Sequence, residues 1–342
     1  YYYTSEILAL AESAAALYGK HAWLMEYNAG VGLTGFAWER DAYTAAGSGI
    51  KGILYYQWRA DYAYPDSPEP GIFGMLRSDR SRTEKFDRAI AMTRLLRELS
   101  DYLVNAEKFR SGVAVLFSEN VNAWCDAVEN TDPERKQDHV SFVNLESNTE
   151  RTFRCWKDFA RAGISPDFVR TCDLEDNKLN IRLLIVPQEA GLSDVEKQQL
   201  AAFRKHGNWV ATLEHFCVDA GYALPDASTD GKWGTYRSNL EAEHLLIRAG
   251  IEPLFRTEAP FLDVKVLAGD GYYLLSLINH DLFERPIPSG SSLELPFCRG
   301  TAKEAWFFVP GGKKPVRFSN ETTGLKLRLP EISSGGFLLL RL

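Results

Sequence analysis

The sequence predicts an α/β protein that ends in a small all-β part. Strand and helix patterns alternate from residue 5 to about residue 104. The alternation continues from about 110 to 253, where the strands are unbroken apolar runs. After about residue 257 the helical periodicity stops and short strands follow one another. We therefore expect three domains, at 1–108, 109–257 and 258–342.

In the first domain the pattern is helix, strand, helix, strand, helix. Ser5 is placed to cap the first helix, and a strand over 22–25 runs directly into Glu26. A helix over 37–46 and a strand over 53–56 follow. A proline-rich loop then leads to Ser81-Arg82-Thr83-Glu84, which predicts a capping box at the start of a long helix. Strands that alternate with helices indicate βαβ units and a parallel sheet.

The middle domain shows strands that are apolar throughout, such as Val113–Phe117 and Leu183–Val186. Such runs are typical of parallel strands covered on both faces. Three Ser-x-x-Glu capping boxes predict helix starts, at Ser147, Ser193 and Ser238. These features favour an open, doubly wound, flavodoxin-like sheet. In the last domain, short strands separated by Asp-Gly, Pro-Gly-Gly and Ser-Gly-Gly turns predict a small antiparallel β-sandwich.

The composition excludes several classes of protein. The 342 residues carry 39 Lys and Arg against 46 Asp and Glu, a formal net charge of −7, and no run of basic residues. We therefore expect no nucleic-acid partner. The apolar stretches are too short to span a bilayer, so no membrane partner is expected either. The chain begins at Tyr1 without Met, which we interpret as the interior of a longer protein.

The metal-binding residue types show no ligand spacing. The five Cys lack any C-x-x-C pair and the six His are scattered, so we expect free thiols, no metal and no cofactor. Free thiols favour a reducing compartment such as the cytoplasm, although a targeting segment upstream would decide it. Cys217 follows His215 closely, but neighbours in sequence seldom form a nucleophile and its base, and packing is the preferred interpretation.

Glu26 is the first candidate for chemistry, because it stands at the end of an apolar strand and is followed by a loop. In a β/α barrel, catalytic groups project from the carboxyl ends of strands. A carboxylate there, beside aromatic residues, suits the nucleophile of a retaining glycosidase. The alternative is a carboxylate that caps a helix or pairs with an arginine.

The next strand ends in Gln57-Trp58-Arg59, which is the second candidate. Sugar rings have apolar C–H faces, so Trp58 at a strand end can serve as a stacking platform, with Gln57 and Arg59 for hydroxyl groups. The alternative is that these aromatic residues fill a sheet–helix interface, and we prefer that interpretation for Tyr55.

Together the segments Trp23–Glu26 and Leu54–Ala60 resemble the last two barrel strands of glycoside hydrolase family 42, a family of retaining β-galactosidases. The resemblance implies the last two βα units of a TIM (β/α)8 barrel, with Glu26 as nucleophile. In the following loop the family has a Glu, a His and a Met at three-residue spacing. Glu69 and Met75 match, and Glu69 is implied to contact the sugar, but Ile72 replaces the His.

The rest of the chain resembles the later domains of the same family, including segments 163–169 and 206–212. The resemblance implies a trimerisation domain in the middle, a homotrimer, and a carbohydrate substrate. It places the acid/base Glu on an earlier barrel strand, so we expect this chain alone to be inactive. The alternative is a non-catalytic trimeric assembly or carbohydrate-binding protein derived from such an enzyme.

Overall fold

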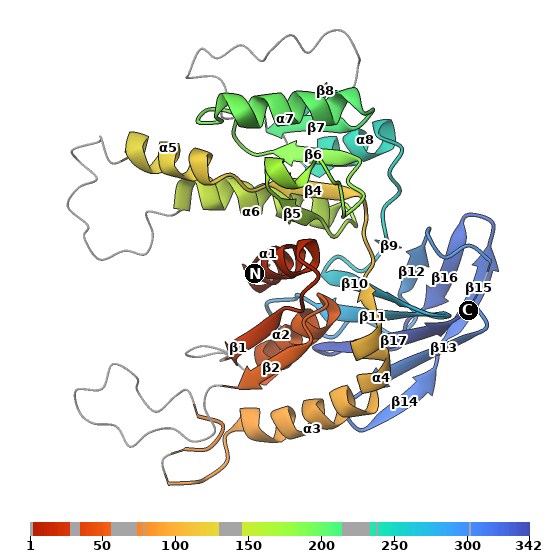
Figure 1. Cartoon of the computed structure of the whole chain (residues 1–342). Coiled ribbons are helices and arrows are strands. Elements are labelled where there is room, and N and C mark those ends of the chain that lie inside the picture. The colour runs from red at the N-terminus through yellow and green to blue at the C-terminus, as the bar shows by residue number, and fades with distance from the viewer. Residues whose placement is uncertain are drawn as a thin grey trace. The chain divides into compact units, whose positions relative to one another are not determined.

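The computed structural model shows a chain that folds into two compact units (Figure 1). The first unit combines residues from both ends of the chain, 1–15, 20–109 and 254–342. The second holds residues 16–19 and 110–253. The structure describes residues 3–27, 35–55, 74–77, 79–129, 146–213, 233–236, 239–300 and 302–342.

The N-terminal part of the first unit contains a parallel strand pair and four helices. The order is α1 (Tyr3–Leu17), β1 (Trp23–Tyr27), α2 (Gly35–Gly47), β2 (Gly52–Tyr55), α3 (Glu84–Glu98) and α4 (Ser100–Asn105). β1 pairs with β2 in parallel, so the expected βαβ arrangement is present. α1 already begins at Tyr3, and Ser5 therefore lies inside the helix instead of capping it.

Two expected capping boxes have different outcomes. α3 begins only at Glu84, after Thr83, and the Thr83 hydroxyl donates to the Met75 carbonyl (2.7 Å) instead of capping the helix. The box predicted from Ser81 is therefore wrong, because the backbone of Ser81 and Arg82 pairs with Arg77 and Leu76 instead of entering the helix. The box at Ser193 is confirmed, since its side chain accepts from the Glu196 amide while the Glu196 carboxylate accepts from the Ser193 amide.

The C-terminal part of the first unit is built from two antiparallel sheets. A six-stranded sheet has the order β14-β13-β17-β11-β10-β3 and a four-stranded sheet has the order β15-β16-β12-β9. Alternate side chains of both sheets fill a shared core, for example Val264, Leu275 and Leu327. The strands are β3 (Glu107–Lys108), β9 (Arg256–Thr257), β10 (Leu262–Gly269), β11 (Tyr272–Asn279), β12 (Ser292–Leu295), β13 (Glu304–Val309), β14 (Gly312–Pro315), β15 (Arg317–Glu321), β16 (Gly324–Arg328) and β17 (Gly335–Arg341).

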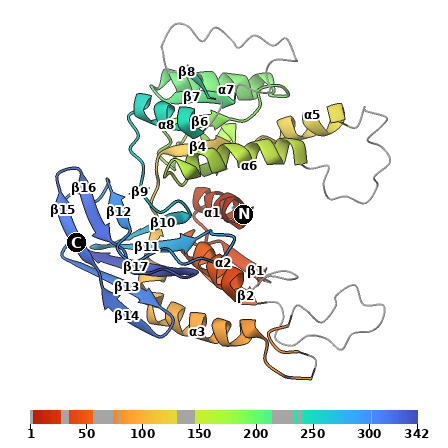
Figure 2. The ribbon, with the colours of Figure 1, turned by 180° about the vertical axis from the view of Figure 1, so that it is seen from behind.

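The other face of the six-stranded sheet is covered by helices from the N-terminal part. Figures 1 and 2 both place α2 beside β10, β11 and β17, which it contacts. Trp38, Tyr43 and Met92 of these helices form one core with Leu274 and Phe337 of the sheet. Burial of such large side chains contributes on the order of 2 kcal/mol each, so the helices and the sheet stabilise one another.

The second unit contains a parallel sheet in the order β5-β4-β6-β7-β8. In chain order this is 2-1-3-4-5, the arrangement of one class of doubly wound sheets. Ala114 and Leu184 face the helix α7, while Val113 and Leu183 point to the opposite side, and all four are buried. The elements are β4 (Val113–Leu116), α5 (Glu119–Glu129), α6 (Glu146–Arg161), β5 (Asp167–Val169), η2 (Thr171–Asp173), β6 (Leu183–Val186), α7 (Asp194–Lys205), β7 (Trp209–Leu213), β8 (Trp233–Tyr236) and α8 (Asn239–Arg248).

The predicted combination of α/β and antiparallel β structure is therefore confirmed. The assignment of β1 and β2 to a TIM barrel stays a prediction, as does the flavodoxin-like identity of the second unit.

Candidate functional site at the carboxyl ends of β1 and β2

Glu26 is the penultimate residue of β1, and β1 ends beside the end of β2. Leu24 pairs with Ile53, and Tyr27 pairs with Tyr55, so β1 holds one residue more than β2 between these pairs. Such a bulge re-aims a side chain, and bulges are over-represented next to active sites. Glu26 thus lies at the irregular end of a parallel strand pair, the location where β/α proteins carry catalytic groups.

Only part of the predicted site belongs to the described residues. Gln57, Trp58, Arg59 and Glu69 lie outside them, and for Glu26 the structure describes the strand but not the side chain. Tyr55 packs on Trp38 of α2 with ring centroids 5.5 Å apart, which confirms its interpretation as an interface residue. Met75 is buried in the core between the helices and the six-stranded sheet.

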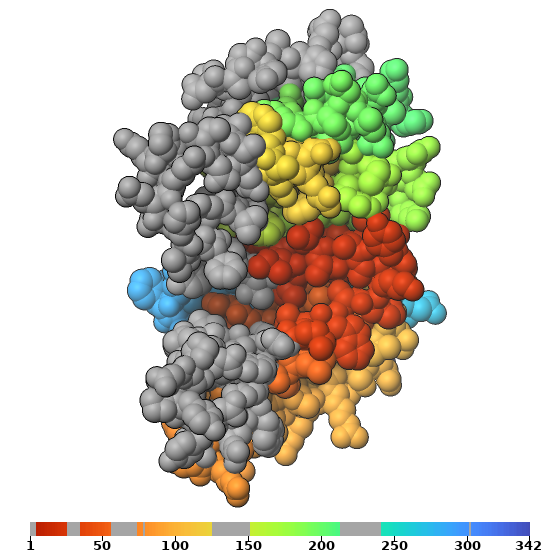
Figure 3. Space-filling view, turned by 60° about the vertical axis from the view of Figure 1, so that its left-hand side comes forward, coloured from red at the N-terminus to blue at the C-terminus, as the bar shows by residue number. Residues whose placement is uncertain are grey.

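The two faces of the strand pair are unequal. Leu24, Ile53 and Tyr55 pack against the core that contains α2. Trp23 and Met25 of β1 are each 61% exposed. In the space-filling view the red N-terminal segment lies at the surface (Figure 3). An exposed apolar face on a pair of parallel strands is unusual, because parallel strands are normally covered on both faces.

α2 connects the two strands, and the six-stranded sheet holds it in place. Every residue of α2 is buried. Two glycines permit the close approach: a Cβ at Gly47 would overlap Ser276 of β11, and a Cβ at Gly335 of β17 would overlap the Tyr43 ring. The Ser276 hydroxyl donates to the Tyr43 carbonyl at 2.9 Å. The sheet therefore fixes the helix that supports both candidate strands.

Charged residues of α2 are buried with partners. The Glu39 carboxylate accepts from Ser334, the residue before β17 (2.7 Å), and from Arg88 of α3 (2.9 Å). Arg40 pairs with Asp41 at 3.1 Å. Burial raises the pKa of the Asp41 carboxyl despite the opposing charge of Arg40. These pairs avoid the cost of an isolated buried charge.

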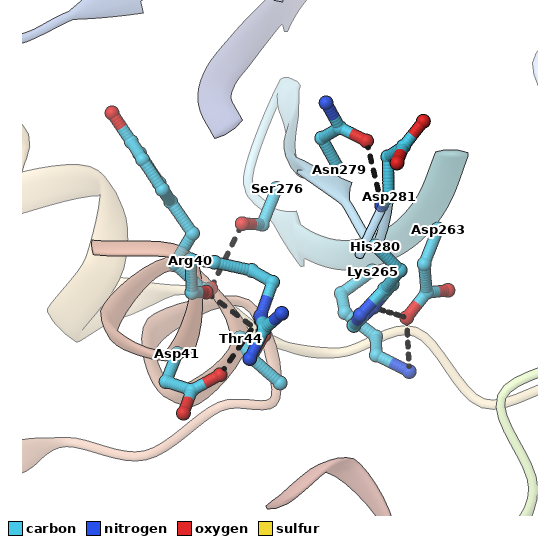
Figure 4. Close-up of polar contacts among 10 residues, drawn as sticks. Arg40, Asp41, Thr44, Asp263, Lys265, Ser276, Asn279, His280 and Asp281 are labelled. Carbon is cyan, nitrogen blue, oxygen red and sulfur yellow. Dashed lines mark hydrogen bonds and ion pairs between the residues drawn. The ribbon is translucent and has the colours of Figure 1, made fainter. Parts of the chain in front are cut away.

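Next to α2, two residues of β10 and the residue that follows β11 form a second buried polar group (Figure 4). The Asp263 carboxylate lies 3.1 Å from the Lys265 ammonium and 3.5 Å from His280 Nε2, and all three side chains are buried. Burial alone would raise the pKa of Asp263, but the charge of Lys265 and the contact with His280 outweigh it and hold that pKa well below its usual range. The group is closed to solvent, so a substrate in solution does not reach it.

Sequence reasoning missed this buried group, although a signal existed. Asp263 and Lys265 are two residues apart in the alternating stretch Leu262–Ala268, so a strand necessarily places them on one face. We interpreted His280 only as one of several scattered histidines. Among the described residues no cluster of three or more His, Cys, Asp or Glu could hold a metal ion.

In the second unit, the carboxyl ends of β4 and β6 lie at the point where the strand order reverses. Glu196 accepts from Ser118 (2.6 Å) and from Asn120 (2.9 Å), residues that follow β4. Glu189 follows β6, and burial raises the pKa of its carboxyl to about 7. His215 and Cys217 lie outside the described residues.

Two further expectations concern the thiols and the membrane. Of the cysteines that the structure describes, Cys155, Cys172 and Cys298 are thiols that form no disulfide. Within the described ranges, every helix falls short of the length and apolarity that crossing a bilayer requires.

Comparison with known proteins finds similarity in fold but no match in sequence. No protein-family model matches the sequence, and no curated protein does. Among solved structures, a GH42 β-galactosidase from G. stearothermophilus is similar over 99% of this chain and 56% of its own, with 13% identity and a TM-score of 0.66. A β-galactosidase from Bacillus circulans sp. alkalophilus is similar over 98% and 58%, with 13% identity and a TM-score of 0.64.

An α-L-fucosidase isoenzyme 2 from Paenibacillus thiaminolyticus is similar over 98% of this chain and 62% of its own, with 12% identity and a TM-score of 0.58. The chain thus spans 56 to 62% of the length of these three structures. The expected likeness to GH42 β-galactosidases is confirmed at the level of the fold.

Proposed function

We propose that this chain contributes to the active site of a retaining glycoside hydrolase and that Glu26 is the nucleophile. The observation that carries the proposal is the place of Glu26, at the bulged carboxyl end of β1 beside the end of β2. The likeness of the fold to GH42 β-galactosidases supports it. In this proposal β1, α2 and β2 belong to the last two βα units of a TIM barrel.

The proposed reaction follows the double-displacement scheme. The Glu26 carboxylate attacks the anomeric carbon and forms a glycosyl ester as the bond to the leaving oxygen breaks. A second carboxyl protonates that oxygen and then activates a water, which releases the sugar and regenerates Glu26. We assign the second carboxyl to a barrel strand outside this chain. Trp58 stacks on the sugar ring, and Gln57, Arg59 and Glu69 contact its hydroxyl groups.

We further propose that the second unit is a flavodoxin-like trimerisation domain and that the assembled enzyme is a homotrimer. The parallel strand order 2-1-3-4-5 supports the fold assignment. The substrate class is a terminal β-linked, galactose-like sugar. A similar fold also occurs in an α-L-fucosidase, an enzyme named for a different sugar.

The proposal is tested by joining this chain to the missing barrel strands of a GH42 β-galactosidase and assaying hydrolysis of a nitrophenyl β-galactoside. Glu26→Gln should lower kcat by roughly 10³-fold or more, because no covalent intermediate can form. The matched control Glu258→Gln changes an exposed carboxylate and should leave kcat unchanged. A 2-deoxy-2-fluorogalactosyl fluoride should label the peptide that contains Glu26.

Two results would contradict the proposal. Label on another carboxylate would show that Glu26 is not the nucleophile. Steady hydrolysis by the isolated chain would show that the chain itself holds every catalytic group. The non-catalytic alternative predicts sugar binding without turnover in both the parent and Glu26→Gln forms.

A further inference from the structure

A cleft of about 370 Å³ lies on the helix-facing side of the six-stranded sheet. No residue of β1 or β2 lines it, so it is distinct from the site proposed at Glu26. Its walls come from the end of α3, from α4, and from β13, β14 and β17, which Figure 1 shows next to one another. On β13, Ala305 and Phe307 point into the core between the sheets, so Trp306 and Phe308 point toward this cleft. Its volume lies within the range of small-molecule sites, roughly 300–1,000 Å³.

Aromatic side chains form the floor of the cleft. Trp306 is half-buried, and its indole Nε1 lies 3.4 Å from the Glu304 carboxylate, to which it donates a long hydrogen bond. The Lys313 ammonium lies over the rings of Trp306 and Phe308, 5.5 and 5.7 Å from their centroids. An exposed cation–π contact is weak, so an entering ring can displace the lysine. The apolar C–H face of a pyranose suits such a floor.

Polar groups line the rim. Arg341 donates to the Tyr102 hydroxyl at 2.8 Å and pairs with Glu304 at 3.7 Å. The side chains of Glu304 and Arg341 are 52% and 53% exposed, so each keeps hydrogen-bonding capacity toward solvent. Glu98 adds an exposed carboxylate on the opposite wall. Planar charged groups beside an aromatic ring are well suited to bind vicinal hydroxyl groups.

The charges of the cleft balance. Glu98 and Glu304 contribute two negative charges, and Lys313 and Arg341 contribute two positive ones. A site with no net charge favours an uncharged ligand over an anionic or cationic one. From the floor, the rim and this balance we propose that the cleft is a non-catalytic binding site for a pyranose unit of a neutral oligosaccharide. The inference is independent of the function proposed for Glu26.

The test is calorimetric titration of the whole chain with neutral β-1,4-galactotriose and, separately, with trigalacturonic acid. The chain should bind the neutral trisaccharide and discriminate against the anionic one. Trp306→Ala should weaken binding about tenfold or more, and Glu304→Gln should weaken it several-fold. The control Phe283→Ala removes an aromatic ring that is 80% exposed elsewhere in the same unit and should leave the affinity unchanged.

Two further variants keep the test decisive. Trp306→Phe retains a ring for folding and should bind between the parent and Trp306→Ala. Glu258→Gln removes an exposed carboxylate outside the cleft and should bind like the parent, which makes it the charge-matched control for Glu304→Gln. The proposal is overturned if the parent shows no saturable binding at millimolar concentrations, if it prefers trigalacturonic acid, or if Trp306→Ala and Glu304→Gln bind like the parent.

Discussion

Two parallel sheets in the described part of the chain are covered in different ways. In the second unit the strands β4 and β6 are buried along their whole length, with helix α7 on one face. In the first unit β1 and β2 are covered by α2 on one face, while Trp23, Met25 and Leu54 are exposed among the described residues. Apart from Glu26 and Gly52, the residues of β1 and β2 are apolar like those of β4 and β6, so the exposed apolar side chains reflect what covers the strands.

The bare face of β1 and β2 bears on the proposed function. A parallel pair with one bare apolar face is incomplete by the general rule for parallel sheets. In the proposal for Glu26, further barrel strands pair with β1 and β2 and cover that face. The second unit needs no such complement, and we expect it to be the more self-sufficient of the two.

The largest expected difference is between two tryptophans, one buried in the second unit and one on the bare face of β1. Trp156 of α6 is fully buried in the second unit and donates to the Pro166 carbonyl at 3.0 Å. Trp156→Ala should lower the free energy of unfolding by about 3–5 kcal/mol. Trp23→Ala on the bare face should lower it by less than about 1 kcal/mol, as measured by urea unfolding. Equal losses would mean that the bare face is covered in solution.

A second prediction concerns the buried group beside α2. Asp263→Asn removes the charge that faces Lys265 and should cost about 3 kcal/mol of unfolding free energy, because a buried ammonium loses its partner. Asp194→Asn breaks an exposed pair with Lys197 and should cost less than about 1 kcal/mol. Hydrogen exchange should show faster opening of α2 only in Asp263→Asn. A loss below about 1 kcal/mol for Asp263→Asn would contradict this role.

The sign of the pH dependence follows from the lowered pKa of Asp263. Its stabilisation is complete above the unfolded pKa of about 3.9 and is lost as the pH falls toward the folded value. Asp263→Asn should therefore differ most from the parent near neutral pH and least in strong acid.

The smallest expected effect distinguishes two glutamates of the second unit. Burial raises the folded pKa of Glu189 from 4.5 to about 7, so stability is lost as the pH rises through this range and the loss is complete above it. Glu189→Gln should raise the free energy of unfolding by about 1–2 kcal/mol at pH 8, after allowance for solvent screening, and leave it unchanged near pH 4. The expected gain at pH 8 would be contradicted by unfolding curves that coincide at both pH values.

Glu196 provides the opposite case. Hydrogen bonds from Ser118, Ser193 and Asn120 outweigh its burial and lower its pKa, so its stabilisation is present above about pH 4.5 and is lost in acid. Glu196→Gln should therefore lower stability at pH 8 by about 1–2 kcal/mol, the reverse of Glu189→Gln.

Local patterns predicted the fold well and the interface of α2 poorly. The apolar runs of β4 and β6 and the capping box at Ser193 depend on neighbours in sequence, and they were correctly predicted. The burial of Glu39 depends on Ser334, 295 residues away, which no local pattern reveals. The place of Glu26 at a strand end was predictable, but the bulge before Tyr27 comes from pairing with β2.

Because the first unit is assembled from both ends of the chain, its two parts are synthesised at different times. Tyr43 and its hydrogen-bond partner Ser276 are separated by 233 residues. At translation rates of about 5–20 residues per second, α2 leaves the ribosome roughly 10–50 s before the sheet that buries it. During this interval the second unit can complete its own sheet, whereas α2 exposes Trp38 and Tyr43. The first unit therefore depends on whatever protects these side chains from aggregation until synthesis of the chain ends.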